Sequence, residues 1–363
     1  MKKLSLELER MPQSEKAMAR VAAWFNQSII DRPPVRFGHH NEAYDAANTD
    51  QTRWKSLRER WFDAEYQVDA FLKNLESRTF RAETFPFYWP NLGPEIYAAF
   101  FGIELEFGEV TSWAKPVIED IGDPAQRDIP CFNPDNPYYR KLLEMTQVAL
   151  EKCTGKAFVG VSSWSPGIDC LAGWREPQEL CMDLLTTPDE VHELLRKQIE
   201  PLSRIIDPFY DAIEACGHPS IAWMGIPAAG RCHISQTDFA NMISPDQFRT
   251  FCLPYLRQEL EKFEYNLFHM DGKGVANHVE DLIAEPGINA IQWAQGVGDD
   301  EPILQWIPLI KKIQAAGKSV VVDLKTAELE EFISQMKPEG LFLWIAAEDK
   351  DQDSILRRIE KWS

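Results

Sequence analysis

Short runs of apolar residues recur along this chain, and longer stretches with hydrophobic residues every three or four positions separate them. Short runs rich in β-branched and aromatic side chains are typical of strands, whereas the longer spacing is typical of amphipathic helices. We expect an eighth strand in residues 80–115, where the periodicity is weak. The clear strand candidates are Val35 to Phe37, Phe158 to Trp164, Ile221 to Gly225, Asn266 to Met270, Ala290 to Ala294, Val320 to Leu324 and Leu341 to Ala346.

Helical periodicity fills the intervals between the later strand candidates. The predicted helices are Glu179 to Leu195, Pro245 to Phe263 after the cap-like Ser244, Pro302 to Ala316 before Gly317, and Thr326 to Met336. Strands that alternate with helices predict βα units and a parallel sheet. Because no glycine-rich phosphate loop follows an early strand, the pattern favours an α/β fold of the (β/α)8 kind, a TIM barrel, over an open doubly wound sheet.

Residues 1–80 differ from the rest because long helical patterns dominate there. The clearest runs from Gln51 to Phe71 and contains Trp54 and Trp61. We predict that residues 1–80 form an N-terminal helical layer packed on the barrel, without being an independent domain. Residues 30–360 are expected to form the barrel itself.

The composition is acidic and otherwise typical of a globular enzyme. The 363 residues include 57 aspartates and glutamates against 38 lysines and arginines, a formal net charge of −19. That charge disfavours nucleic acid as a partner and favours a small molecule or another protein. The seven cysteines form no CxxC pair and predict reduced thiols in a cytoplasmic protein. Without a long apolar run we expect neither a secretion signal nor a membrane span.

The pentapeptide from Phe268 to Gly272 ends a predicted strand with His269 and Asp271. Residues two apart on a strand share a face, so these two side chains point to one site. In a barrel, the C-terminal ends of the strands carry the chemistry. A histidine near a strand end is also common as a structural group, and Asp-Gly is a turn signal. His269 and Asp271 are therefore catalytic candidates that depend on their neighbours.

Polar or aromatic side chains occur at the ends of other predicted strands. Because the loops after barrel strands build the active site, we expect these side chains to converge there. Asp323 is a third catalytic candidate. The aromatic candidates suit a flat ligand, because a stacked ring contributes about 0.5–1.5 kcal/mol beyond burial. The candidate substrate-binding residues are His39, His40, Asn91, Trp164, Asp169, His233, Gln292, Trp293 and Trp344.

Four segments follow one another along the chain: Pro33 to Phe37, Ile168 to Arg175, Ile243 to Leu256, and Phe268 to Gly272. They resemble, in order, the opening strand, the D-x-L-A-G-x-R motif, the I-S-P-x-x-F…P-Y helix and the H-x-C-G motif of the uroporphyrinogen decarboxylase superfamily. That superfamily includes the decarboxylase and corrinoid-dependent methyltransferases. The resemblance spans most of residues 30–360 and implies a (β/α)8 barrel with an N-terminal helical part.

One departure from this family lies after the opening strand. Decarboxylases carry an arginine-rich loop there that clamps the carboxylates of the substrate, whereas this chain has Gly38, His39, His40, Asn41 and Glu42. Because this protein is acidic and lacks that arginine clamp, a porphyrinogen is a disfavoured substrate.

A second departure concerns the metal. In thiol-methylating members zinc is held by H-x-C and a later cysteine, and this chain has Asp271 and Glu348 near those places. The resemblance implies a divalent metal such as zinc held by His269, Asp271 and Glu348, with oxygen ligands that favour activation of water or an alcohol over a thiol. The alternative is a site without metal, in which Asp271 and Asp323 bind or protonate a pterin ring.

These observations predict a methyltransferase that moves a methyl group between a corrinoid protein and a small acceptor or donor. One alternative is a decarboxylase of a porphyrinogen or another carboxylate substrate. Another is a non-catalytic barrel that binds a corrinoid partner. Methyl transfer to or from a methylcorrinoid separates the first prediction from the other two.

Overall fold

The computed structural model of this protein describes residues 4–38 and 53–362. Within those residues, the largest sheet contains six parallel strands in the order β1-β12-β11-β10-β9-β8. Helices alternate with the last five of these strands along the chain, so the fold is mixed α/β. The strands are β1 (Val35–Phe37), β8 (Cys232–Gln236), β9 (Tyr265–Asp271), β10 (Ala290–Ala294), β11 (Ser319–Lys325) and β12 (Leu341–Ala346).

The two faces of this sheet have different surroundings. Side chains of register neighbours lie on the same face. His269 neighbours Gln236 and Gln292, and we call their side the inner face. The opposite, outer face carries Trp293, which packs against Trp306 of the 3₁₀ turn η4 (Ile303–Trp306) with ring centroids 4.8 Å apart. Burial on both faces explains why β10 to β12 are rich in apolar and β-branched residues.

In the described part of the chain, three two-stranded sheets accompany the main sheet. β2 (Phe87–Tyr88) pairs in parallel with β5 (Phe158–Val159). The other two are antiparallel hairpins, β3 (Leu105–Phe107) with β4 (Ser112–Ala114) and β6 (Ser220–Ile221) with β7 (Pro227–Ala228).

Individual hydrogen bonds connect the smaller sheets with the edges of the main sheet. Just before β2, the Glu83 N–H donates to the carbonyl of Val35, the first residue of β1. The Val161 N–H after β5 donates to Ile221 of β6. The Ser220 hydroxyl accepts the N–H of Cys232, the first residue of β8, at 2.9 Å. The two edge strands β1 and β8 are therefore linked through β2, β5 and β6.

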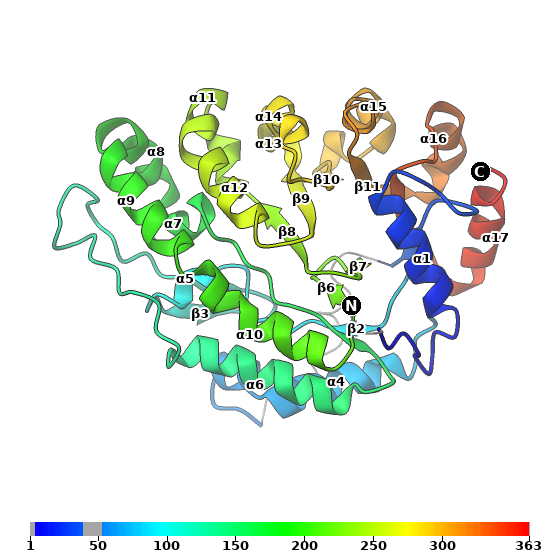
Figure 1. Ribbon diagram of the computed structural model, residues 1–363, viewed down its shortest axis with the longest axis horizontal. Helices are drawn as coiled ribbons and strands as arrows, with labels where there is room; N and C mark the ends of the chain where they lie inside the picture. Colours follow the sequence, from blue (N-terminus) through cyan, green and yellow to red (C-terminus); the bar gives the residue numbers. More distant parts are fainter. Residues whose placement is uncertain (1–3, 39–52, 363) are drawn as a thin grey trace.

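Helices surround these strands. Figure 1 shows them along the outside of the molecule, with β6 and β7 near its middle. Within the described ranges, none is both long and apolar enough to cross a membrane. The helices are α1 (Ser14–Phe25), α3 (Leu57–Trp61), α4 (Ala64–Leu75), α5 (Ile96–Ala99), α6 (Pro137–Lys152), α7 (Ile168–Trp174), α8 (Pro177–Thr186), α9 (Pro188–Ile199), α10 (Leu202–Ala215), α11 (Pro245–Gln247), α12 (Leu253–Leu260), α13 (Gly272–Ala276), α14 (Val279–Ala284), α15 (Ile307–Ala315), α16 (Leu329–Gln335) and α17 (Asp349–Ile359).

Two predicted helices differ from the observed ones for local reasons. The stretch from Glu179 to Leu195 is split into α8 and α9, because Thr187 leaves the helical conformation (φ −138°, ψ 51°) before Pro188. The stretch after Ser244 begins with the expected cap, a capping box between Ser244 and Gln247. It then continues through α11, a π-helical turn (Phe248–Cys252) and α12.

α1 covers the N-terminal ends of β11 and β12. Trp24 Nε1 donates to the Gly340 carbonyl at 3.0 Å, and the Ser319 hydroxyl donates to the Trp24 carbonyl at 2.5 Å. Helices α1, α3 and α4 are the helical elements described in residues 1–80. The division into a helical layer at 1–80 and a barrel at 30–360 stays a prediction.

A buried ion network joins α1 to the start of β1. Glu83, which is fully buried, accepts hydrogen bonds from Arg32 at 2.7 Å, Arg20 at 3.0 Å and the Val35 N–H at 2.7 Å. Arg20 also pairs with Asp31 at 2.6 Å, and this hydrogen bond holds the pKa of Asp31 well below its ordinary value. Each of these charges therefore faces an opposite charge.

The strand predictions succeed where the apolar pattern is dense. The predicted strands Ala290 to Ala294 and Leu341 to Ala346 coincide with β10 and β12, and β2 lies within residues 80–115 as expected. The run at Ile221 overlaps only β6 in a hairpin, whereas the main sheet contains β8, which the pattern missed because polar residues interrupt it. The described main sheet has six strands, and the eight-stranded barrel stays a prediction.

Candidate active site

Side chains from two neighbouring strands meet on the inner face at their C-terminal ends. His269 lies near the end of β9, and Asp271, two residues further, shares its face. Phe268 and Met270 are fully buried on the outer face. A shift of the strand register by one residue would turn them to the inner face, so their burial fixes the orientation of His269. Asp238 follows β8 in the 3₁₀ turn η1 (Asp238–Met242).

Asp238, His269 and Asp271 form a compact group that we call the Asp-His-Asp cluster. One ligand atom from each residue lies within 4.8 Å of the other two. An imidazole and two carboxylates are donors that divalent metals accept. The cluster contains two of the three predicted metal ligands, with Asp238 in place of Glu348. Glu348 is largely exposed and pairs with Lys350 at 2.5 Å.

The surroundings of His269 favour a neutral imidazole. Burial lowers the pKa of His269, although its hydrogen bond with Gln292 and the charges of Asp271 and Asp169 act in the opposite direction. His269 Nδ1 donates a hydrogen bond to Gln292 Oε1 at 2.5 Å. The other ring nitrogen, Nε2, therefore carries the lone pair. Gln292 is only 1% exposed and is therefore held in place. A neutral, oriented imidazole is the form that binds a metal or takes up a proton.

The carboxyl groups in and beside the cluster repel one another. Desolvation by the surrounding protein, followed by the charge of Asp271, raises the pKa of Asp238 to about 6, although solvent still reaches the side chain. Burial, followed by the charge of Asp238, raises the pKa of Asp169 to about 7, although backbone N–H groups oppose this shift. Among the described ion pairs, none joins a lysine or arginine to these three carboxyl groups. A bound cation would relieve the repulsion.

Another part of the inner face carries a second set of candidates. Asp323 of β11, Trp344 of β12 and Arg36 of β1 are successive register neighbours. The Arg36 guanidinium lies over the Trp344 ring, 4.9 Å from its centroid. The predicted catalytic residue Asp323 and the predicted substrate-binding residue Trp344 thus face the same side as His269.

The tip of the β6–β7 hairpin reaches the inner face. The Trp223 ring packs edge-on against His269, with centroids 5.3 Å apart. The carbonyl of Met224 accepts a hydrogen bond from Arg36 at 2.8 Å. Gly225 has a φ of 70°, and a Cβ there would lie 2.7 Å from the Phe87 ring, so only glycine fits. The tip therefore contacts residues of β1, β2 and β9 and forms a floor for the site.

The fold resembles that of a methyltransferase. A solved structure of a methyltransferase from Methanosarcina mazei matches 95% of this chain and 98% of its own length, with a TM-score of 0.60 and 13% sequence identity. No family model matches the sequence, and no curated protein matches it. At 13% identity the likeness concerns the fold alone.

Two predicted substrate-binding residues point to the outer face instead. His233 lies within β8, and its Nε2 is 2.5 Å from Glu259 of α12. Trp293 follows Gln292 directly and therefore faces the opposite side, where it packs against Trp306. These positions correct the sequence prediction for both residues, because alternation along β8 and β10 turns their side chains away from the inner face.

The remaining predicted residues have separate places. Trp164 is fully buried and packs against Phe209, with centroids 5.0 Å apart. Asn91 Oδ1 accepts the Gly93 N–H at 2.8 Å in the turn after β2. Asp169, on α7, contacts the turn that carries Asp238. His39 and His40 lie outside the described residues.

The sequence pattern places Asp238 among the polar residues after the predicted strand at Ile221, but it does not predict Asp238 as a metal ligand. The apolar pattern places a strand at Ile221 and so treats His233 as the start of the following loop. In the structure His233 belongs to β8, and the polar loop begins at Thr237. The signal that points to Asp238 is the alternation along Cys232–Gln236 followed by an aspartate.

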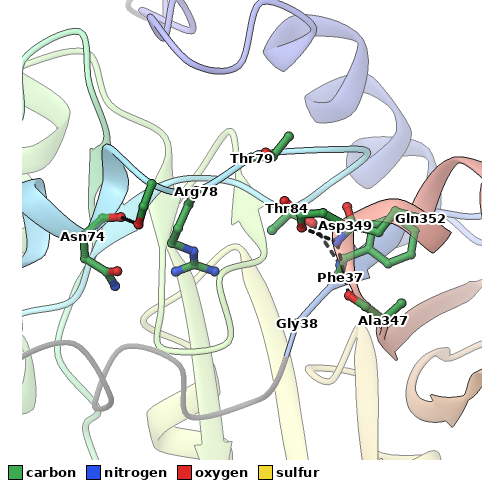
Figure 2. A pocket seen from close by; sticks show the side chains of 10 residues that line it. Phe37, Gly38, Asn74, Arg78, Thr79, Thr84, Ala347, Asp349 and Gln352 are labelled. Atoms are coloured by element: carbon green, nitrogen blue, oxygen red, sulfur yellow. Dashed lines mark hydrogen bonds between the residues drawn. The ribbon is translucent and has the colours of Figure 1, made fainter.

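A separate cavity of about 350 Å³ opens at the C-terminal ends of β1 and β12. Figure 2 shows the Arg78 side chain between Asn74 on one side and Phe37 with Thr84 on the other. The Thr84 hydroxyl accepts the Phe37 N–H at 2.9 Å. None of the residues of the Asp-His-Asp cluster lines this cavity. Its lining consists of Phe37, Gly38, Asn74, Ser77, Arg78, Thr79, Thr84, Ala347, Asp349 and Gln352.

Proposed function

We propose that this chain is an enzyme of the uroporphyrinogen decarboxylase superfamily that transfers a methyl group between a corrinoid protein and a small acceptor or donor. The observation that carries the proposal is the Asp-His-Asp cluster at the C-terminal ends of β8 and β9. The ordered sequence motifs support the family, and the fold shared with the Methanosarcina mazei methyltransferase supports the reaction class. A cytoplasmic location agrees with seven cysteines that form no disulfide.

In this proposal the parallel strands form a (β/α)8 barrel over residues 30–360, with the helices of residues 1–80 packed on it. The hydrogen bonds that link β1 to β8 through the smaller sheets support this arrangement. The eight strands are then β1, β2, β5, β8, β9, β10, β11 and β12, and the β6–β7 hairpin is inserted between β5 and β8. Such a barrel carries its chemistry at the C-terminal ends of its strands.

Asp238, His269 and Asp271 would hold a divalent metal such as zinc. The donor types fit, and the bond from His269 to Gln292 resembles the hydrogen bonds that orient metal-binding histidines in general. The excess of negative charge at the cluster also favours a cation. A metal bound there supplies a Lewis acid that eases loss of a proton from an acceptor hydroxyl or thiol, with oxygen ligands favouring the hydroxyl.

The other inner-face residues bind and orient the small substrate. Trp223 closes the site beneath His269, and Trp344 offers an aromatic surface braced by Arg36. Asp323 lies beside Trp344 and would accept a hydrogen bond from the substrate. In the alternative without metal, Asp271 and Asp323 bind or protonate a pterin ring.

The experiment begins with protein purified without chelators or an affinity tag, whose bound metal is measured. The protein is then incubated with methylcobalamin and a panel of small alcohols, thiols and amines. Transfer of the methyl group leaves cob(I)alamin, methylates the acceptor and releases the acceptor proton, and the visible spectrum reports the change. We expect stoichiometric metal and methyl transfer, with both lost in Asp238→Ala.

Glu348→Ala is the matched control, because the exposed Glu348 lies outside the cluster. Its metal content and turnover should equal those of the wild type. Absence of methyl transfer in both directions, together with absence of metal, contradicts the proposal. Carbon dioxide release from a porphyrinogen or another carboxylate favours the decarboxylase alternative. Binding of a corrinoid protein without turnover favours the non-catalytic one.

A further inference from the structure

The turn that carries Asp238 has no hydrogen-bonded cap of its own. η1 follows β8 after the single residue Thr237, whose side chain does not cap it. The first N–H groups of a helical turn need acceptors from elsewhere. The Asp238 side chain is exposed, so packing does not fix its position. Its place in the Asp-His-Asp cluster depends on one hydrogen bond, from Gln236 Nε2 to Asp238 Oδ2 at 3.2 Å, and on what holds the backbone of η1.

Asp169 supplies the missing acceptors at the start of η1. Its Oδ2 accepts the Asp238 N–H at 2.9 Å, and its Oδ1 accepts the Phe239 N–H at 3.0 Å. Asp169 lies on α7, about 70 residues earlier in the sequence, so this is a tertiary contact between separate elements. Both carboxylate oxygens are engaged with the backbone of the turn. Asp169 therefore acts on the site through Asp238.

His278 holds the middle of the turn. The fully buried imidazole has its Nε2 2.9 Å from the Ala240 carbonyl, to which it donates. Its ring stacks on Phe248 with centroids 4.5 Å apart, which fixes the direction of the donor. In addition, Asn241 Nδ2 lies 3.4 Å from the carbonyl of Asp271 and ties η1 to the end of β9. Three separate elements thus restrain five residues.

We infer that Asp169 and His278 are positioning residues that hold η1 so that the Asp238 carboxylate completes the Asp-His-Asp cluster. This role replaces the direct substrate contact that the sequence predicted for Asp169. The consequence for cation binding rests on the proposed function, whereas the restraint on the backbone does not.

The substitution Asp169→Asn tests the first restraint. An amide offers one acceptor oxygen, and its NH₂ group faces the second backbone N–H, so one hydrogen bond is lost. Hydrogen–deuterium exchange of peptides covering Asp238–Met242 should become about tenfold faster, as the loss of one such bond predicts. Zn²⁺ affinity, measured by calorimetry on chelator-stripped protein, should fall about 10- to 100-fold.

His278→Phe tests the second restraint, because it keeps an aromatic ring against Phe248 and removes the donor to Ala240. The same two effects are expected. Asp63→Asn is the matched control: Asp63 also accepts a backbone N–H, that of Tyr66 at 3.0 Å, but at the start of α4. That variant should leave both the exchange of Asp238–Met242 and the Zn²⁺ affinity unchanged.

The outcomes distinguish the positioning role of Asp169 and His278 from the proposed binding of a metal. If the wild-type protein binds no Zn²⁺, the proposed metal function fails, and the exchange data alone decide the positioning role. Unchanged exchange of Asp238–Met242 in folded Asp169→Asn overturns the inference, as does faster exchange with undiminished Zn²⁺ affinity in a Zn²⁺-binding protein. If Asp169→Asn does not fold, the same criteria apply to His278→Phe.

Discussion

The two ends of the parallel strands carry charged groups in opposite ways. At the start of β1, Glu83 lies between Arg20 and Arg32, and each charge has an oppositely charged partner. At the end of β9, the exposed Asp238 and Asp271 lie beside the half-buried His269, and their proximity contributes to the raised pKa of Asp238. The ion network around Glu83 is balanced in charge, whereas the Asp-His-Asp cluster has an excess of negative charge.

This difference teaches what each end contributes. A buried charge with a complete set of partners supports the fold, because removal of one partner leaves the other unpaired. Like charges held together lower stability unless a cation or a proton binds, and such arrangements are concentrated at functional sites. Mutations in the ion network should therefore change stability, whereas mutations in the Asp-His-Asp cluster should change binding and turnover.

The largest effect is expected for Glu83→Ala. The substitution leaves two buried guanidinium groups without their shared carboxylate, and breaking a buried ion pair costs about 3–5 kcal/mol. The free energy of unfolding from urea denaturation measures this loss. Zn²⁺ affinity of the folded variant should equal that of the wild type. A loss of Zn²⁺ affinity in the folded variant would show that the Glu83 ion network also supports the metal site, contrary to the division of roles between the two ends.

His269→Ala and Asp271→Ala should show the converse pattern. Changes around a metal typically cost 10- to 100-fold, so removal of a ligand should lower turnover by at least about 100-fold. Asp271→Asn keeps the shape and should also lower turnover, because the charge is lost. Methyl transfer from methylcobalamin measures the effect, and urea denaturation checks the fold. Undiminished turnover in both alanine variants would assign these residues a structural role.

Asp238→Asn should stabilise the metal-free protein while it weakens Zn²⁺ binding. Removing one of two neighbouring carboxylates relieves their mutual repulsion, which is one cause of the raised pKa of Asp238. The gain should be largest above the pKa of Asp238, which is about 6, because the repulsion acts on the charged form. Thermal melts at neutral pH and at pH 5 test this sign. A destabilised Asp238→Asn variant would show that repulsion is not the main cost at this end.

The smallest effect concerns acid pH at the ion network. The hydrogen bond from Arg20 lowers the pKa of Asp31, so its contribution to stability is present above the unfolded pKa of about 4 and is lost as the pH falls. Asp31 is partly exposed, so solvent screening limits the contribution to about 1 kcal/mol or less. Urea denaturation between pH 6 and pH 3 should be less pH-dependent in Asp31→Asn. If the wild type and Asp31→Asn show identical stability profiles against pH, Asp31 does not contribute to the stability of the ion network.

The sequence predicted the parts of this fold in which local pattern and tertiary structure agree. β10 and β12 are continuous apolar runs, and their bounds match the prediction. β8 was missed because its burial comes from packing of the main sheet, to which it belongs, against α12. Its polar residue His233 is tolerated there because Glu259 of α12 pairs with it. No local pattern shows that contact.

The candidate site was predictable to a similar extent. The i and i+2 spacing placed His269 and Asp271 on one face, as observed. Period-two alternation also shows that Gln292 and Trp293 have opposite faces, but it does not say which of them is inward. Asp238 and Asp169 come together only through a contact between α7 and η1, far apart in sequence. Such pairs follow from tertiary packing, and spacing along the chain does not reveal them.

The floor formed by Trp223 and Met224 has a consequence for the order of events in the proposed reaction. With that side of the inner face covered, both reactants approach the cluster through the loops after the strands. The small reactant then has to enter first, and the corrinoid protein closes over it. An excess of the corrinoid protein should occupy the entrance prematurely, so initial rates should fall at high partner concentration and recover when more of the small reactant is supplied.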